Sequence, residues 1–191
     1  MKFRNILLLL LALGSTSVAY AAEGGRPAWY VGLTATSFNF ERTGTLSHSY
    51  NTHGYMGVLG VDLGPYLALE ARGGQGDSDK DSNGLSLQAR EVSAAYVRLN
   101  LPLDGGKVLV YALGGFASVN VKAELGAVTH TKSITDNSYG VGIELYGSRS
   151  TALRAEYTRY LFNKNYTDAA LGLANDNFDL NAVSFGIVHH F

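Results

Sequence analysis

The chain has 191 residues, a formal net charge of -1 and no cysteine, so it holds one domain or two and has no disulfide, thiolate metal site or thiol nucleophile. Only 16% of its residues are charged, against roughly a quarter in an ordinary soluble domain. The near-neutral charge argues against a nucleic-acid-binding protein, which usually carries a basic stripe.

The first segment has the pattern of a secretory signal peptide. Lys2 and Arg4 precede an apolar run at 6–13, and a small-residue cleavage site follows at 19–21. The apolar run is too short to span a bilayer, which takes about 20 residues. We therefore expect residues 1–21 to be removed and residues 22–191 to form the folded domain.

Alternation of apolar and polar residues, the mark of a strand with two different faces, recurs through the mature chain. It predicts eight strands, at about 29–40, 55–63, 67–72, 95–101, 109–120, 139–145, 153–161 and 183–191. The strand at 109–120 has an apolar face made of Leu109, Tyr111, Leu113, Ala117 and Val119. We expect the apolar face of each strand to lie on the same side of the sheet.

Short and long links alternate between these strands. Tight-turn sequences lie at 64–65, 103–106 and 147–150. The other four links are long and polar, at 41–53, 75–86, 123–137 and 163–177. Short links at one end and long links at the other are typical of a barrel in a bacterial outer membrane. The sequence therefore predicts an all-β fold, an eight-stranded antiparallel up-and-down transmembrane β-barrel.

Alternation alone does not decide which face points outward, because a soluble lipocalin-like barrel has the opposite polarity and a similar length. Charged residues lie on the polar faces of four strands, and they could pair inside a narrow lumen. They are Glu70, Arg72, Arg98, Glu144, Arg154 and Glu156. We expect a structural charge network inside and apolar residues against lipid. Because side chains can just fill an eight-stranded interior, a plugged lumen is favoured over a gated ion path.

Aromatic residues gather near the ends of the predicted strands, as in the girdles at the two membrane interfaces. One rim is expected to hold Trp29, Tyr66, Tyr146 and Phe191. The other is expected to hold Phe38, Phe40, Tyr55, Tyr139, Tyr160 and Phe162. By parity, Arg159 faces lipid near the outer rim, where it either meets lipopolysaccharide phosphates or simply extends to the interface.

The last ten residues form an apolar-alternating strand that ends in phenylalanine. Its Phe185, Ile187 and Phe191 resemble the terminal insertion signal of bacterial outer-membrane barrels. With the opening at 29–32 and the strands around 69–72 and 153–157, this ending makes the mature chain similar to the small eight-stranded OmpA-like/OmpX-like barrel family. His189 departs from that family, which often has an aromatic residue there.

This resemblance implies an integral outer-membrane protein of a Gram-negative bacterium. It implies an envelope role or an adhesion-like surface interaction through four extracellular loops. The partners that it implies are the lipid bilayer, lipopolysaccharide, the barrel-assembly machinery through the C-terminal strand, and a host or environmental surface ligand. No nucleic acid is expected among them.

Two loop patterns could bind metal ions, but neither is complete. The segment 77–84 contains the opening of a calcium loop, in Asp79, Asp81, Asn83 and Gly84, but Arg90 stands where the pattern needs a bidentate glutamate. A solvated loop tip is the favoured interpretation. The loop histidines His48, His53 and His130 have no ligand-like spacing. We therefore expect neither a metal nor a cofactor.

An enzymatic function has little support in the sequence. The His-x-Ser pair that lipid A deacylases carry on a strand does not occur in this chain. We therefore expect no enzyme. A lipid A-modifying enzyme and a soluble periplasmic lipocalin-like binding barrel remain the alternatives.

Overall fold

The computed structural model describes residues 28–43, 48–80, 85–125, 128–168 and 173–191. These ranges contain nine strands and one short 3-10 turn, η2 (Asp104–Gly106). The strands are β1 (Ala28–Thr43), β2 (His48–Asp62), β3 (Leu67–Gly76), β4 (Ser78–Lys80), β5 (Leu85–Leu103), β6 (Val108–Leu125), β7 (Val128–Tyr146), β8 (Thr151–Asp168) and β9 (Leu173–His190). The expected signal peptide at 1–21 lies outside the described residues.

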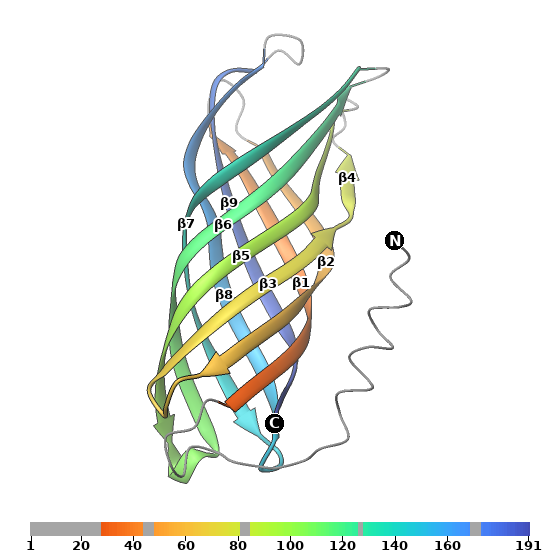
Figure 1. Ribbon diagram of the computed structural model, residues 1–191. Coiled ribbons are helices and arrows are strands. Elements are labelled where there is room, and N and C mark those ends of the chain that lie inside the picture. The colour runs from red at the N-terminus through yellow and green to blue at the C-terminus, as the bar shows by residue number, and fades with distance from the viewer. Residues whose placement is uncertain (1–27, 44–47, 81–84, 126–127, 169–172) are drawn as a thin grey trace.

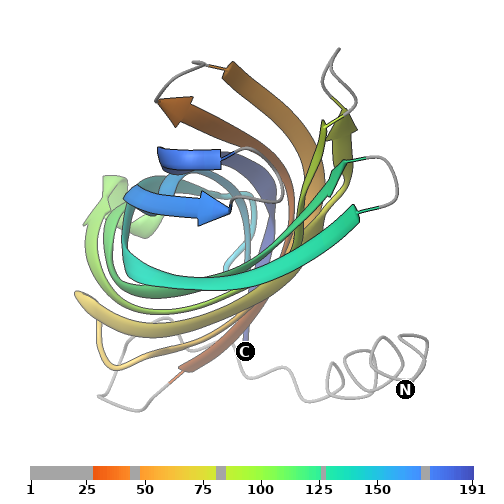
Figure 2. The same ribbon diagram turned by 90° about the horizontal axis from the view of Figure 1, so that it is seen from above.

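The strands close into a barrel (Figure 1). Neighbouring strands are antiparallel, and β1 pairs with β9 to close the ring between the two ends of the chain. β3 and the three-residue β4 both pair with β5, on either side of Asp77, so they count as one stave of the barrel. Seen from above, the strands curve around a common axis (Figure 2). The predicted eight-stranded antiparallel barrel is confirmed.

Tight turns lie at one end of the barrel, called here the turn end, together with the start of β1 and the C-terminus (Figure 1). They join β2 to β3, β5 to β6 and β7 to β8, at the predicted positions. At Asp104, Gly105 and Gly106 the φ angles are 48°, 64° and 87°, a left-handed path that glycine adopts at little cost. The opposite end is called the loop end.

The described residues include no helix of sufficient length and apolar character to cross a membrane.

The strands extend further toward the loop end than the sequence predicts. β6 and β7 pair from Val108↔Leu145 as far as Leu125↔Val128, so most of the link expected at 123–137 is strand. The other links expected as loops are also largely strand, at 41–53, 75–86 and 163–177. Where side chains are described in these segments, the outward positions are polar, as at Ser49, Asn51, Ser133 and Thr135, so the apolar alternation that marks the rest of each strand fades there.

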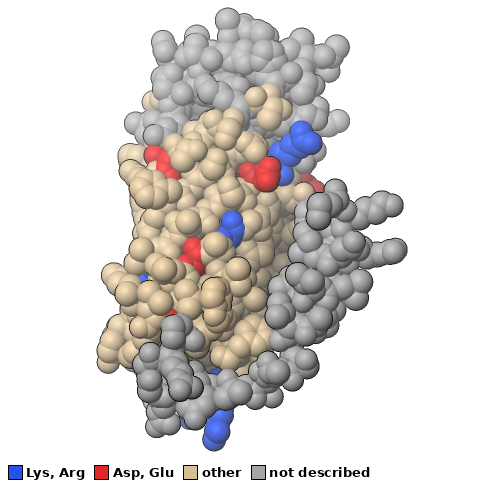
Figure 3. All heavy atoms as spheres, in the orientation of Figure 1, with Lys and Arg blue, Asp and Glu red and all other residues tan. Residues whose placement is uncertain are grey.

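In the half of the barrel near the turn end, the outward positions are apolar. Leu69, Val97 and Ile187 are 44%, 47% and 54% exposed, whereas the charged Glu70 and Arg154 point inward and are buried. Charged side chains are few on the face shown in Figure 3. A soluble protein rarely exposes so large an apolar surface, so this wall, called the apolar band, faces lipid. The lipocalin-like alternative is therefore wrong.

In the half near the loop end, the polarity of the wall is reversed. Apolar side chains point inward and form a buried core that includes Phe38, Phe40, Met56, Val92, Val119, Leu161 and Leu180. The outward positions are polar and exposed, among them Asn51, Ser93, Ser133, Thr135 and Asn137. This half has the pattern of a barrel in water, which indicates that it projects beyond the bilayer.

The reversal corrects the expected outer aromatic girdle. Phe38, Phe40 and Tyr160 are fully buried in the core of the loop-end half, whereas Tyr55 and Tyr139 lie exposed on the wall. Phe162 is exposed as well. In the inner girdle Trp29 and Tyr66 are exposed and Phe191 is half-buried, but Tyr146 points inward.

The expected direction of β6 is also wrong. Its apolar face, from Leu109 to Val119, points into the barrel and is buried, and Val110 and Phe116 form the wall. Both faces of β6 carry apolar residues, so alternation could not distinguish them. On β8, a register shift between Arg159 and Leu161 places Leu161 in the core directly after Tyr160.

The boundary of the apolar band can be tested with one arginine on each side of it. Leu69→Arg places a charge on the band and should lower the free energy of unfolding by about 2–4 kcal/mol. Ser133→Arg adds the same side chain to the polar wall and should change the free energy of unfolding by less than about 0.5 kcal/mol. Urea unfolding of the barrel in lipid vesicles, followed by a heat-modifiable gel shift, measures both. Equal losses would contradict the boundary.

Candidate functional site in the barrel lumen

The six charged residues that the sequence singles out converge inside the turn-end half of the barrel. β3 supplies Glu70 and Arg72, β5 supplies Arg98, β7 supplies Glu144, and β8 supplies Arg154 and Glu156. Each is at most 7% exposed. The alternation of strand side chains explains this placement, because members of the same strand are two positions apart. Three carboxylates and three guanidinium groups balance in charge.

Glu144 binds two arginines at the end of this network nearer the turns. Its Oε1 atom accepts hydrogen bonds from Arg98 Nη1 at 2.8 Å and from Arg154 Nη2 at 2.7 Å. Arg154 Nη2 also donates to Glu70 Oε2 at 3.0 Å. Glu144 and Arg154 are on neighbouring strands, and β5 lies two strands from β7, whereas the Arg154–Glu70 bond joins β8 to β3 across the lumen.

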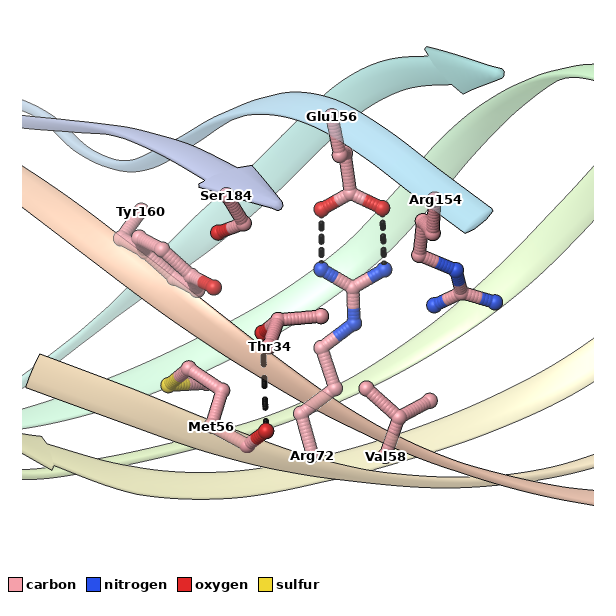
Figure 4. Close-up of a pocket in the computed structure, with 8 residues that line it drawn as sticks. All are labelled: Thr34, Met56, Val58, Arg72, Arg154, Glu156, Tyr160 and Ser184. Atoms are coloured by element: carbon pink, nitrogen blue, oxygen red, sulfur yellow. Dashed lines mark hydrogen bonds and ion pairs between the residues drawn. The ribbon is translucent and has the colours of Figure 1, made fainter. Parts of the chain in front are cut away.

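Arg72 joins two glutamates at the other end of the network. Its two terminal nitrogens donate to the two oxygens of Glu156, with Nη2 to Oε2 at 2.6 Å (Figure 4). Its Nε atom donates to Glu70. β3 and β8 are not neighbours in the sheet, so this bidentate pair also crosses the lumen. Planar bidentate pairs of this kind are among the stronger and more directional ion pairs.

Two tyrosines that the sequence did not predict as members also bind to the network. Tyr30 Oη donates to Glu70 Oε2, and Tyr111 Oη donates to Glu156 Oε2, both at 2.8 Å. The Arg98 guanidinium lies 4.0 Å from the centre of the Tyr111 ring and 5.4 Å from that of Tyr30, within cation–π range.

Glycines opposite these rings leave the space that they occupy. A Cβ atom at Gly60 would collide with the Tyr30 ring, and one at Gly142 would collide with the Tyr111 ring. A tyrosine paired with an inward glycine on a neighbouring strand is the sequence signal that could have identified both.

An uncharged polar layer and then an apolar layer lie above the charge network, toward the loop end. Thr36 Oγ1 and Ser184 Oγ are 2.9 Å apart in a hydrogen bond. A narrow void separates the network from the apolar core, with Arg72 and Glu156 on one side and Met56 and Tyr160 on the other (Figure 4). Beyond it lie the buried side chains of Phe38, Phe40 and Leu180. Two buried layers of different chemistry, one charged and one apolar, therefore follow each other along the lumen.

Arg159 lies on the outer wall at the edge of the apolar band, as parity predicts. It forms an ion pair with Asp179 at 2.6 Å, and its guanidinium lies 4.1 Å from the centre of the Phe162 ring. Its Nη1 atom is also 3.4 Å from Tyr139 Oη. Its charge is thus compensated within the protein.

The residues of the expected C-terminal insertion signal lie on the last strand and at its end. Phe185 and Ile187 are exposed on the apolar band, and the backbone N–H of Phe191 donates to the Trp29 carbonyl at 2.8 Å. The last strand thus presents an apolar outer face and pairs with the first strand.

The loop patterns considered for metal binding fall largely outside the described residues. Of the segment 77–84, Ser78–Lys80 form β4, and residues 81–84 are not described. His53 is exposed, and the side chains of His48 and His130 are not described. Among the residues that are described, no three His, Asp or Glu side chains come together in a way that could hold a metal ion.

Known proteins share this architecture. A search of curated proteins gives no match. Neisserial surface protein A matches with a TM-score of 0.65 at 14% identity, over 85% of this chain and 97% of that one. Ail of Yersinia pestis, in complex with the heparin analogue sucrose octasulfate, matches with a TM-score of 0.60 at 12% identity, over 87% and 99%. The N-terminal barrel of Pseudomonas aeruginosa OprF matches with a TM-score of 0.52 at 14% identity, over 84% and 97%.

These identities are low enough that the structural matches support the fold alone. The family model described as "Outer membrane protein beta-barrel domain" matches residues 7–191, nearly the whole chain. It agrees with the apolar band, the closed antiparallel sheet and the arrangement of turns. The chain belongs to the outer-membrane β-barrel family and is a small eight-stranded barrel of the bacterial outer membrane.

Proposed function

We propose that this barrel is a non-conducting, non-catalytic membrane anchor that presents its loop end to the cell's surroundings. The observation that carries the proposal is the double closure of the lumen, by the charge network and by the apolar core above it. A barrel closed in this way offers no path for solutes, so its surface is the part available for interaction. The loop end faces outward if the short turns are periplasmic, as is usual in such barrels.

The charge network has a structural role in this proposal. Its bonds join β3 to β8 and β5 to β7, pairs of strands that do not neighbour one another in the sheet. These charges find all their partners only when the barrel has closed in the correct register. Buried ion pairs add little net stability, but removing one partner leaves an uncompensated charge. The network therefore favours the closed, in-register barrel over alternatives.

The net charge of the loop end indicates the class of surface ligand that it would bind. The four extracellular segments expected at 41–53, 75–86, 123–137 and 163–177 contain four Lys and Arg residues and eight Asp and Glu residues, a net charge of -4. Ail binds a heparin analogue, which is a polyanion. Because like charges repel, we propose a cationic or neutral partner for this chain. The ligand of that relative does not transfer to it.

The polarity of the outer wall indicates which membrane components each part of the barrel would contact. The apolar band contacts lipid tails, and the polar positions just beyond it lie at the level of lipid headgroups and lipopolysaccharide sugars. The C-terminal strand, with Phe185, Ile187 and Phe191, is proposed as the segment that the barrel-assembly machinery recognises. An enzymatic role acting on lipid A has no support in the described geometry, because the buried polar groups of the lumen are separated from the loop end by the apolar core.

Conductance measurements test the double closure. Planar bilayers with the wild-type barrel should show no current above the leak of the bilayer, and Glu144→Gln should leave this unchanged because the apolar layer persists. Phe40→Ala with Leu180→Ala should also stay closed, since the network persists. Only the variant that combines Glu144→Gln, Phe40→Ala and Leu180→Ala should conduct. A wild-type current that Glu144→Gln alters would instead support a gated ion path through the network.

Unfolding measurements test the structural role of the network. Arg72→Met should lower the free energy of unfolding by about 3–5 kcal/mol, because it leaves Glu156 buried without its partner. Adding Glu156→Met should restore at least half of that loss. The matched control is Arg159→Met, which breaks the ion pair on the outer wall and should cost less than about 1 kcal/mol. If Arg72→Met and Arg159→Met are equally mild, the network has no such role.

Adhesion measurements test the surface role. Cells of a Gram-negative host that display the barrel should adhere to immobilised matrix proteins more than cells with an empty vector. The triple change Asp77→Asn, Asp79→Asn and Asp81→Asn should weaken adhesion without changing the heat-modifiable band, because it removes negative charge from the loop end. Retention on immobilised heparin that the triple change leaves intact would contradict a cationic or neutral ligand. Adhesion no higher than that of the empty-vector cells would contradict the surface role, and adhesion that the triple change leaves unaltered would contradict a cationic ligand.

A further inference from the structure

His190 occupies the floor of the lumen at the turn end. It is the last residue of β9, and its side chain is only 14% exposed. The imidazole lies between two inward tyrosine rings, with ring centres 4.9 Å away for Tyr30 and 5.5 Å away for Tyr146. The other histidine of this strand, His189, points to the outer wall, where it contacts Thr151.

The imidazole connects strands that are not its neighbours. Its Nδ1 atom is 3.1 Å from Asp62 Oδ2, on β2. Its Nε2 atom is 3.0 Å from Tyr146 Oη and 3.7 Å from Glu144 Oε2, both on β7. β9 pairs with β1 and β8, so β2 and β7 each lie one strand further around the ring. The side chain therefore spans five strands across the turn end.

Counting protons shows which form of His190 satisfies this arrangement. Tyr146 Oη lies 3.1 Å from Glu144 Oε2 and donates to it. A hydroxyl has one proton, so Tyr146 cannot also donate to Nε2. An imidazolium solves the conflict, because it donates from Nδ1 to Asp62 and from Nε2 to Tyr146, whose proton stays on Glu144. A neutral ring with its proton on Nδ1 donates to Asp62, but the single proton of Tyr146 can then serve only Nε2 or Glu144. A neutral ring with its proton on Nε2 donates to Tyr146 but has no proton to donate to Asp62.

The surrounding charges favour the same form. Besides Tyr30 and Tyr146, the titratable groups that face His190 are the carboxylates of Asp62 and Glu144. Arg98 and Arg154 bind the other oxygen of Glu144, and the six charges of the network already balance without His190. An imidazolium therefore supplies the charge that compensates Asp62.

We propose that Asp62, His190, Tyr146 and Glu144 form a protonation-dependent latch that closes the turn end of the barrel. In acid the latch holds β2, β9 and β7 together through three hydrogen bonds in series. When His190 loses its proton, one of these bonds is lost and the turn end is held less tightly. This inference is independent of the surface role, because it concerns the opposite end of the molecule.

The latch predicts the sign of a pH effect. The folded barrel favours the imidazolium, whereas a histidine of an unfolded chain titrates near 6.5. Folding therefore takes up protons at neutral pH, so the latch contributes fully below about pH 6.5 and its contribution is lost as the pH rises and the folded barrel releases the proton.

The experiment measures the unfolding temperature of the wild-type barrel in neutral phosphatidylcholine vesicles at pH 5.5, 7.0 and 8.5, using the heat-modifiable gel shift. The midpoint should be higher at pH 5.5 than at pH 8.5 by roughly 3 °C or more. His190→Gln, which cannot titrate, should abolish this difference. His189→Gln is the matched control on the outer wall and should retain it.

Two further variants keep the test decisive if His190→Gln fails to fold. Tyr146→Phe removes the hydroxyl relay to Glu144, and Asp62→Asn removes the charge that the imidazolium compensates. Each should at least halve the difference in midpoint between pH 5.5 and pH 8.5. The latch is refuted if the wild type shows no pH dependence, if His190→Gln keeps the full difference, or if His189→Gln removes it.

Discussion

The need to hydrogen-bond every backbone group within the protein governs this structure. Lipid offers no partner to an N–H or C=O group, so a sheet can cross the bilayer only as a closed ring. Pairing of β1 with β9 completes that ring. Once it is closed, alternation forces each strand to present one face to lipid and one to the lumen. Where the outward face of a strand belongs to the apolar band, its charged residues lie in the interior, and there they must pair.

The charge network and the apolar core solve different problems along one axis. Near the turn end, where the wall is apolar, the interior holds the polar side chains and compensates them with three balanced glutamate–arginine sets. Near the loop end, where the wall is polar, the interior becomes an ordinary hydrophobic core. The reversal of polarity occurs within continuous strands. One closed sheet therefore forms both the half that faces lipid and the half that faces water.

The two ends of the molecule differ in chemistry and in proposed role. At the loop end the segments at 41–53, 75–86, 123–137 and 163–177 carry excess negative charge, and the described outward positions of the wall are rich in hydroxyl and amide groups. At the turn end the penultimate residue of the chain connects two carboxylates from distant strands. The buried arginines and glutamates of the network lie along the axis between the two ends.

The sequence by itself determined the strand number, the turns, the closure topology and the six members of the charge network, because a period of two and its turn residues are local properties. The extent of the strands, the direction of β6 and the places of Phe38, Phe40 and Tyr160 were decided only by tertiary structure. Both faces of β6 carry apolar residues, so the pattern does not show which face is buried. Beyond the apolar band, apolar aromatic residues such as Phe38 and Phe40 point into the barrel instead of outward. A local pattern cannot show where along its length a strand leaves the lipid; that depends on how the staves are staggered against one another.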